Sequence, residues 1–139
     1  VPYISTVNAT NRWVDSVFKK LNRNEKIGQL FMVRAHTNLG QAYSDSVAKV
    51  IAKQHLGGVV FFQGGPKRQA ILTNQYQSLY KKVPLMIAQD AEWGLGMRLD
   101  STLSYPYQMT LGAIQNNNLI YKMGQMVAKD LKRLGVHIN

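Results

Sequence analysis

The sequence contains no cysteine, few acidic residues and no long hydrophobic run. Without cysteine, disulfides and thiolate-bound metals are excluded, and the three histidines, His36, His55 and His137, do not have metal-ligand spacing. The longest apolar segment, around residues 59–62, is far shorter than the roughly 20 residues that a membrane span needs. We therefore expect a soluble domain without metal or cofactor. Because no charged-then-apolar leader opens it, we expect a mature or trimmed segment.

The scarcity of acidic residues leaves a strongly basic chain. There are 17 Lys and Arg against 7 Asp and Glu, which gives a formal net charge of +10. Clustered cations bind nucleic acid phosphates, so a basic nucleic-acid-binding domain is one alternative. The paired cations, however, fall near the ends of expected helices, where they complement the helix dipole. These pairs are Lys19 with Lys20, Lys81 with Lys82, and Lys132 with Arg133. We therefore predict no nucleic-acid partner.

Short apolar runs alternate with amphipathic segments along the chain. The apolar runs predict strands at residues 31–33, 59–62 and 85–88, and residues 136–138 read as the opening of a fourth. Helical spacing predicts helices over about 12–21, from the Ser44-Asp45 cap to His55, over about 67–82 and over about 117–134. Asn24 is the expected cap of a short turn, and Gly57 the expected left-handed C-cap.

This alternation predicts an α/β fold built from parallel βαβ units. Two architectures fit, an open doubly wound sheet and a (β/α)8 TIM barrel, and the barrel takes about 250 residues. With 139 residues, three complete strands and the start of a fourth, the chain can hold only the N-terminal portion of such a barrel.

The most distinctive side chains follow the third predicted strand. Asp90, Glu92, Trp93 and Arg98 lie where a buried parallel strand ends, which is where α/β folds bind ligands. Carboxylates accept hydrogen bonds from sugar hydroxyls, and an indole packs on the apolar face of a pyranose, so this set suits carbohydrate. The alternative is an Asp90–Arg98 ion pair that only pins a long loop. His36, after the first strand, is either a further site residue or a solvated loop residue.

Several segments together resemble the N-terminal barrel domain of glycoside hydrolase family 3, in particular its β-N-acetylhexosaminidase branch. The resemblance covers about residues 13–139. The segments that carry it, in order, are residues 25–33 (EKIGQLFMV), 57–62 (GGVVFF), 84–94 (PLMIAQDAEWG), 97–99 (MRL) and 109–113 (MTLGA). The resemblance implies residues 1–11 as an N-terminal extension and 12–139 as a partial barrel domain.

The resemblance also implies roles for the acidic loop. By the family's pattern, Asp90 grips hydroxyls of the terminal sugar, while Glu92 and Arg98 shape the loop around it. Glu92 favours the β-N-acetylglucosaminidase side over the alternative β-glucosidase type. The family's Asp-x-Glu-Gly-Gly has its first glycine replaced by Trp93, as in a Bacteroidetes-like variant, and Trp93 is expected beside the substrate.

The family hydrolyses terminal β-linked N-acetylglucosamine or glucose by a retaining route through a covalent glycosyl-enzyme. In its pattern the nucleophile and the acid/base come after the point where this sequence stops, so we expect no catalytic residue here and no activity of this chain alone. A non-catalytic carbohydrate-binding or scaffold module is the alternative. We further expect self-association or contact with the remainder of the barrel, and the branch suggests a periplasmic or extracellular location.

Overall fold

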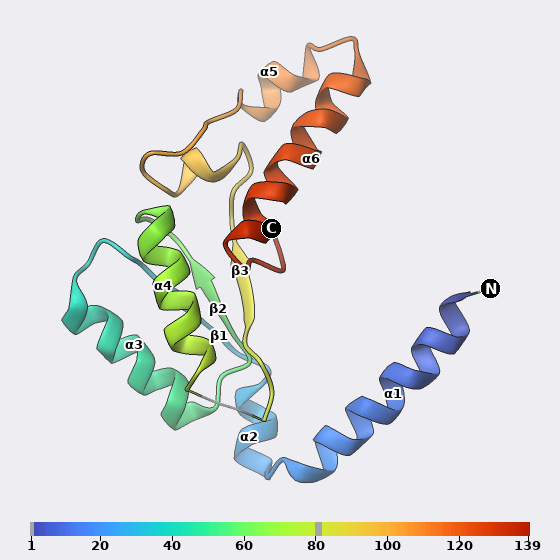
Figure 1. Ribbon diagram of the computed structural model, residues 1–139, viewed down its shortest axis with the longest axis vertical. Coiled ribbons are helices and arrows are strands. Elements are labelled where there is room, and N and C mark those ends of the chain that lie inside the picture. Colours follow the sequence, from blue (N-terminus) through green and yellow to red (C-terminus); the bar gives the residue numbers. More distant parts are fainter. Residues whose placement is uncertain (1, 80–81) are drawn as a thin grey trace.

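A computed structural model describes residues 2–79 and 82–139 of the chain (Figure 1). Helices and strands alternate through the body of the molecule, and a long N-terminal helix extends away from it. The elements are α1 (Pro2–Lys20), α2 (Arg23–Gly28), β1 (Met32–Ala35), α3 (Gln41–Gln54), β2 (Gly58–Phe61), α4 (Pro66–Gln77), β3 (Met86–Gln89), the 3-10 helix η1 (Leu95–Met97), α5 (Gln108–Gly112) and α6 (Asn117–Arg133).

The three strands form one parallel sheet in the order β1-β2-β3. The register pairs Ala35 with Phe61 and Phe61 with Gln89, so all three strands end at the same edge. Parallel neighbours need a crossover, and α3 and α4 supply the two crossovers between them. The predicted α/β class is confirmed, and three parallel βα units are the arrangement of a partial (β/α) barrel.

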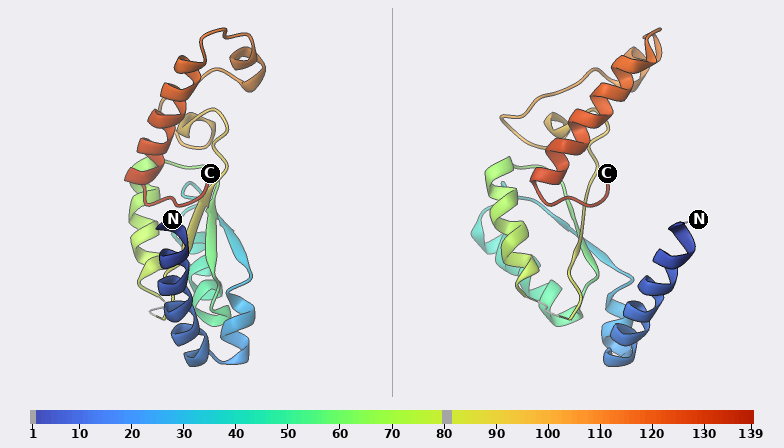
Figure 2. Two further views of the ribbon diagram at one scale, coloured as in Figure 1. Left: turned by 90° about the vertical axis from the view of Figure 1, so that its right-hand side faces the viewer. Right: turned by 45° about the vertical axis from the view of Figure 1, so that its right-hand side comes forward.

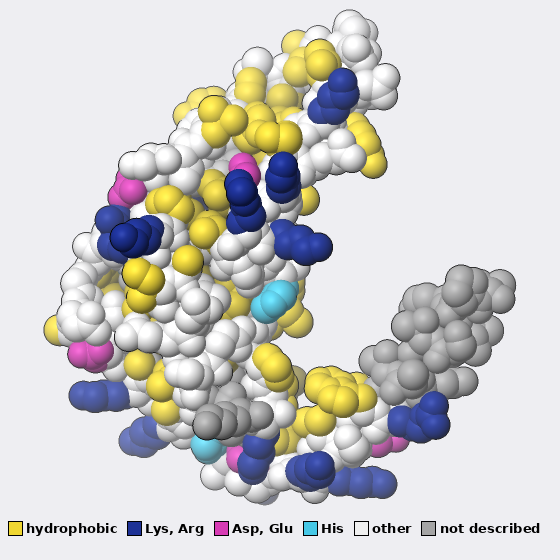
Figure 3. All heavy atoms as spheres, viewed as in Figure 1, with side chains coloured by type: hydrophobic (Ala, Val, Ile, Leu, Met, Phe, Trp, Pro, Cys, Tyr) yellow, Lys and Arg dark blue, Asp and Glu magenta, His cyan; other side chains and the backbone are white. Residues whose placement is uncertain are grey.

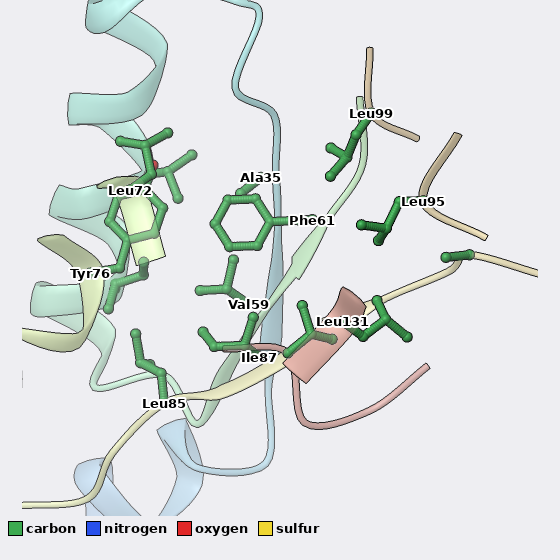
Figure 4. Packing of buried hydrophobic residues seen from close by; sticks show 14 of the residues in the cluster. Ala35, Val59, Phe61, Leu72, Tyr76, Leu85, Ile87, Leu95, Leu99 and Leu131 are labelled. Atoms are coloured by element: carbon green, nitrogen blue, oxygen red, sulfur yellow. The ribbon is translucent and has the colours of Figure 1, made fainter. Parts of the chain in front are cut away.

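The hydrophobic core lies between the sheet and its helices. Val59, Phe61 and Ile87 point from β2 and β3 toward the helical side and are fully buried (Figure 4). From the helices, Tyr76 of α4 and Leu131 of α6 close over them. Because side chains alternate along a strand, the apolar runs of the sequence place every second residue in this core.

The opposite side of the sheet carries no helix in the part of the chain that the structure describes (Figure 2). We name this side the open face. The alternation of side chains places Met32 and Arg34 of β1, Val60 of β2, and Met86 and Ala88 of β3 on it. Both methionines are more than 40% exposed, whereas Ala35 and Ile87, which point to the helices, are fully buried.

Two helix starts differ from the sequence prediction. α1 begins at Pro2 rather than near residue 12, and its Trp13 and Phe18 are exposed. The cap of α2 is Asn22, not Asn24: the Asn22 side chain accepts a hydrogen bond from the Glu25 amide, and the Glu25 carboxylate accepts one from the Asn22 amide. This reciprocal pair is a capping box, which fixes the start of α2.

The ends of α3 and α4 also differ. α3 starts at Gln41, before the expected Ser44-Asp45 cap, and its left-handed C-cap is His55 with a φ of 53°, not Gly57. Gly57 is needed for another reason, because a Cβ there would lie 2.2 Å from the Gln29 carbonyl oxygen. α4 ends at Gln77 rather than near residue 82, so Leu79 lies beyond the helix and is exposed.

The expected fourth strand is present only as a single parallel bridge between Ala88 and Ile138. The Gln89 amide donates to the Ile138 carbonyl at 3.0 Å, and the His137 amide donates to the Ile87 carbonyl at 2.8 Å. The last residues of the sequence therefore run beside β3 toward the carboxyl edge of the sheet.

The lysine pairs are placed partly as expected. Lys19 and Lys20 lie in the last turn of α1, and Lys132 and Arg133 in the last turn of α6. Lys82 does not cap a helix; its ammonium binds the Glu25 carboxylate at 2.6 Å. Lys81 lies outside the described residues.

Candidate functional site

The site begins with the residues that directly follow the three strands. His36, Phe62 and Asp90 each come one position after the register row of Ala35, Phe61 and Gln89. Strand alternation therefore places all three on the open face, at its carboxyl edge. Ligands of α/β barrels bind at this edge because the loops after the strands meet there.

Arg98 contacts two of these three residues, Asp90 and Phe62. Its Nε donates to the Asp90 carbonyl at 2.7 Å, and its terminal nitrogen pairs with the Asp90 carboxylate. The same guanidinium lies over the Phe62 ring, 4.6 Å from the ring centroid. The Arg98 side chain is 13% exposed and that of Asp90 is 49% exposed. The largely buried Arg98 thus fixes the orientation of the Asp90 carboxylate, which itself stays accessible to solvent.

The loop that carries Arg98 is fixed by the core. Leu95 and Leu99, on either side of it, are buried in the hydrophobic cluster. The backbone also bridges to the turn after β2, where the Gly64 amide donates to the Arg98 carbonyl at 3.1 Å and the Asp100 amide to the Gly64 carbonyl at 2.8 Å. Arg98 therefore projects from a backbone that is tied on both sides.

His36 also packs against the Phe62 ring. The two rings stack with centroids 5.8 Å apart, and the Tyr43 ring meets the imidazole edge-on at 5.9 Å. Burial lowers the pKa of His36 below its ordinary value, and the positive charges of Arg34 and Arg98 lower it further. The site thus favours a neutral imidazole beside a cationic arginine pair.

A cavity of about 490 Å³ opens beside Asp90. It is lined by Asp90, Glu92, Gln108 and Asn139, all polar side chains. Gln108 donates to the Glu92 carbonyl at 2.7 Å, and the Asn139 carboxamide holds the backbone of Ala91, accepting from its amide at 2.8 Å. Two carboxylates and two carboxamides give a wall rich in hydrogen-bond acceptors, with amide donors among them.

Trp93 follows the cavity wall in sequence and packs against Tyr107. The ring centroids are 5.2 Å apart with an interplanar angle of 88°, an edge-to-face pair. Gly94 has a φ of 89°, and a Cβ there would lie 2.6 Å from the Tyr105 ring, so only glycine fits after Trp93.

The structure therefore brings some of the site residues predicted from the sequence together around Asp90. The structure brings Arg98 onto Asp90 as the ion pair that the sequence offered as an alternative, and it places Glu92 in the same cavity wall. Trp93 is adjacent in sequence but pairs with Tyr107. Sequence reasoning missed Gln108 and Asn139. Asn139 could have been found, because it directly follows the strand-like run 136–138 and so reaches the same edge.

Two further properties concern the described residues as a whole. Among them, no three His, Asp or Glu side chains gather as they would around a metal ion. None of the helices in this part of the chain combines the length and hydrophobicity needed to cross a membrane.

The fold is that of a partial (β/α) barrel, with a polar cavity at the carboxyl edge of its parallel sheet. Residues 23–139 match the glycosyl hydrolase family 3 N terminal domain. The chain belongs to this family and is therefore a member of a glycoside hydrolase family. Comparison with curated proteins gave no match.

Proposed function

We propose that this chain is the N-terminal part of the barrel of a retaining β-N-acetylglucosaminidase, in which it binds the terminal sugar of a β-linked glycan. The observation that carries this proposal is the half-exposed Asp90 carboxylate, oriented by Arg98 and opening on the cavity that Glu92 also lines. A carboxylate with fixed orientation accepts two hydrogen bonds from neighbouring hydroxyls of one pyranose.

Glu92 is the residue that directs the proposal toward N-acetylglucosamine. In the family resemblance, a glutamate two positions after the aspartate belongs to the N-acetylglucosaminidase branch rather than the β-glucosidase branch. Gln108 and Asn139 add amide donors to the same wall, which suit the carbonyl of an acetamido group. Trp93 directly follows Glu92 in the sequence.

A binding assay tests the proposal. Saturation-transfer NMR with the 139-residue chain should detect N-acetylglucosamine, and Asp90→Asn should abolish the signal because it removes the charge and keeps the shape. The matched control is Asp45→Asn, an exposed carboxylate on α3, which should bind as the unsubstituted chain does. Equal binding of glucose would favour the β-glucosidase branch, and no sugar binding at all would contradict the proposal.

We further propose that neither Asp90 nor Glu92 is the nucleophile or the acid/base, since Asp90 is paired with Arg98 and the family resemblance gives Glu92 a role in shaping the loop. The chain alone should then release no nitrophenol from 4-nitrophenyl N-acetyl-β-glucosaminide. Hydrolysis above the buffer rate that is lost in Asp90→Asn would place catalytic chemistry on these carboxylates and contradict the assignment.

A further inference from the structure

The Phe62 ring contacts two side chains of the site. The Arg98 guanidinium lies over it, 4.6 Å from the ring centroid, and the His36 imidazole stacks against it with centroids 5.8 Å apart. Arg34 also approaches the ring, but it is exposed and its guanidinium carbon is 6.0 Å from the centroid, at the outer limit of a cation–π contact. Arg98 is therefore the cation that lies closer to the ring.

Phe62 does not serve the hydrophobic core. Strand alternation turns Phe61 toward the helices, where it is fully buried, and places Phe62 on the open face, where it is only partly buried. The core cluster of the described residues includes Phe61 and not Phe62. The residues that line the cavity beside Asp90 do not include Phe62 either. What its ring does in the site therefore follows from its contacts with Arg98 and His36.

Arg98 is held on Asp90 by hydrogen bonds that all lie along the edges of its guanidinium. Its Nε donates to the Asp90 carbonyl at 2.7 Å, and a terminal nitrogen pairs with the carboxylate. Because a planar guanidinium donates only along its edges, these bonds restrain its tilt poorly. The Phe62 ring contacts the guanidinium face and limits this tilt. Since the Arg98 side chain is only 13% exposed, water screens this contact little.

The Phe62 ring is itself held by its neighbours. The Phe62 amide donates to the Ala35 carbonyl at 2.8 Å, which ties its backbone to the end of β1. The Tyr43 ring of α3 meets the stacked His36 imidazole edge-on at 5.9 Å. Burial and two nearby arginines lower the pKa of His36, so at neutral pH the imidazole is uncharged and does not compete with Arg98 for the ring.

We propose that Phe62 is a positioning residue of the sugar site. Its ring fixes the plane of the Arg98 guanidinium, and the guanidinium in turn sets the direction in which the Asp90 carboxylate meets the sugar. The inference rests on the proposed sugar-binding role of Asp90. It adds that the affinity for sugar depends on an aromatic side chain that does not itself touch the sugar.

The Arg98 side chain reports on this contact without any sugar. In the ¹⁵N-labelled chain its Nε–H resonance is identified by its loss in Arg98→Lys, and it should show nuclear Overhauser effects to the Phe62 ring. Protons above an aromatic ring are shielded, so the resonance should move downfield in Phe62→Leu, which removes the ring and keeps an apolar side chain. Its exchange with water should also become faster. Phe62→Tyr, which keeps the ring, should preserve both properties.

Sugar affinity tests the consequence. Phe62→Leu should lower the affinity for N-acetylglucosamine about 3- to 10-fold, the range expected for one cation–π contact, and Phe62→Tyr should keep it within about twofold of the unsubstituted chain. Phe31→Leu is the matched control: it removes an exposed phenylalanine that precedes β1, at the opposite edge of the sheet, and should not change the affinity. Far-UV circular dichroism checks that each variant is folded.

The outcomes separate this inference from the proposed function. An Arg98 Nε–H resonance without Overhauser effects to the Phe62 ring, or an affinity for sugar that is the same in Phe62→Leu as in the unsubstituted chain, would overturn the positioning role and leave the role of Asp90 intact. An equal loss of affinity in Phe62→Leu and Phe62→Tyr would also overturn it. Failure of the unsubstituted chain to bind the sugar would contradict the proposed function and, with it, this inference.

Discussion

Arg98 is the residue on which the geometry of the site depends. It contacts both the backbone and the carboxylate of Asp90 and also covers the Phe62 ring. A guanidinium can make all three contacts at once because it is planar and donates along two edges. A lysine ammonium in its place would keep the charge but could not donate to the carbonyl and the carboxylate of Asp90 in the same planar geometry. The side chain of Asp90 is thus aimed by a single neighbour.

We predict that Arg98→Lys lowers the affinity for N-acetylglucosamine about tenfold and the free energy of unfolding by about 1 kcal/mol, because the carboxylate loses its orientation and a largely buried cation loses its partners. Titration by NMR and urea unfolding measure the two effects. Asp100→Asn is the control: it weakens the ion pair between Arg68 and Asp100, which is more than half exposed on both sides, so a loss below about 0.5 kcal/mol is expected. Equal effects of the two substitutions would contradict this account of Arg98.

His36 makes stability depend on pH. Burial and the charges of Arg34 and Arg98 lower the pKa of His36 in the folded chain. Below the ordinary histidine pKa near 6.5, the unfolded state therefore binds a proton more readily than the folded state does. We predict that stability falls as pH decreases from about 7.5 through this range, and that the fall is smaller in His36→Phe. Urea midpoints at pH 7.5 and 5.5 measure it, and an identical fall in both proteins would contradict the prediction.

Among single residues, the sequence predicted those whose position depends on the residues next to them in the chain. Asp90 could be found because it follows an apolar run that had to be a buried strand, and Arg98 because it lies within one loop of it. Gln108 could not be found, since it contacts Glu92 across a sequence separation of 16 positions, in a segment with no periodic pattern. Trp93 was placed in the right loop, but its contact with Tyr107 depends on how that loop folds back.

Among the helices and strands, α2 has the most clearly defined start, because it is fixed by a capping box. Asn22 and Glu25 exchange hydrogen bonds between side chain and backbone at 2.9 and 2.8 Å, and the buried Glu25 also binds Lys82. This arrangement joins the start of α2 to the segment that precedes β3. The cap therefore stabilises a tertiary contact as well as a helix end.

We predict that Asn22→Ala lowers the free energy of unfolding by about 1 kcal/mol, the usual cost of losing a side-chain N-cap. Asn24→Ala is the matched control, because Asn24 lies within the first turn, is exposed and caps nothing, and its loss should change stability by less than about 0.5 kcal/mol. Urea unfolding of the two variants decides the matter; a larger effect at Asn24 would mean that the cap is wrongly assigned.

Strands were predicted more closely than helix ends. A buried parallel strand is an uninterrupted apolar run, and β2 and β3 matched theirs to within one residue at each end. Helix ends are set by tertiary contacts instead: α3 stops where His55 adopts a left-handed conformation, and Gly57 is required by the approach of the Gln29 backbone. Neither fact is visible in local sequence, where a glycine is the more usual C-cap.

At the scale of the whole molecule, much apolar surface is exposed. Figure 3 shows hydrophobic side chains at the surface over α1 and α2, and the open face carries the exposed Met32 and Met86. Leu30 is 82% exposed and Phe31 57% exposed at the entry to β1, which is an edge strand of the described sheet. Such surfaces favour association because burying them releases water.

We predict that the chain self-associates, so that its sedimentation coefficient rises with concentration between about 1 and 100 μM. Replacing Met32 and Met86 with lysine should reduce this rise, because charges on the open face oppose sheet-to-sheet contact. Lysine substitution at the exposed Met126 of α6 is the control and should leave association unchanged. A single concentration-independent species of monomer mass would contradict the prediction.

The overall class was predictable because alternating apolar runs and amphipathic segments permit few arrangements once crossovers must be right-handed. The sequence could not show that α1 begins at Pro2, because Asn8, Thr10 and Asn11 are residue types that usually cap a helix rather than lie inside it. It also could not show that the fourth strand would be reduced to one bridge at Ile138, since strand pairing depends on neighbours distant in sequence.

We propose that Asp90 binds a sugar at the carboxyl edge of the sheet, and site-resolved NMR can decide whether it does. On titration of the ¹⁵N-labelled chain with N-acetylglucosamine, amide shifts should concentrate in residues 89–93 and at Arg98, Gln108 and Asn139, and they should vanish in Asp90→Asn. Shifts that map elsewhere, or that persist undiminished in Asp90→Asn, would contradict it.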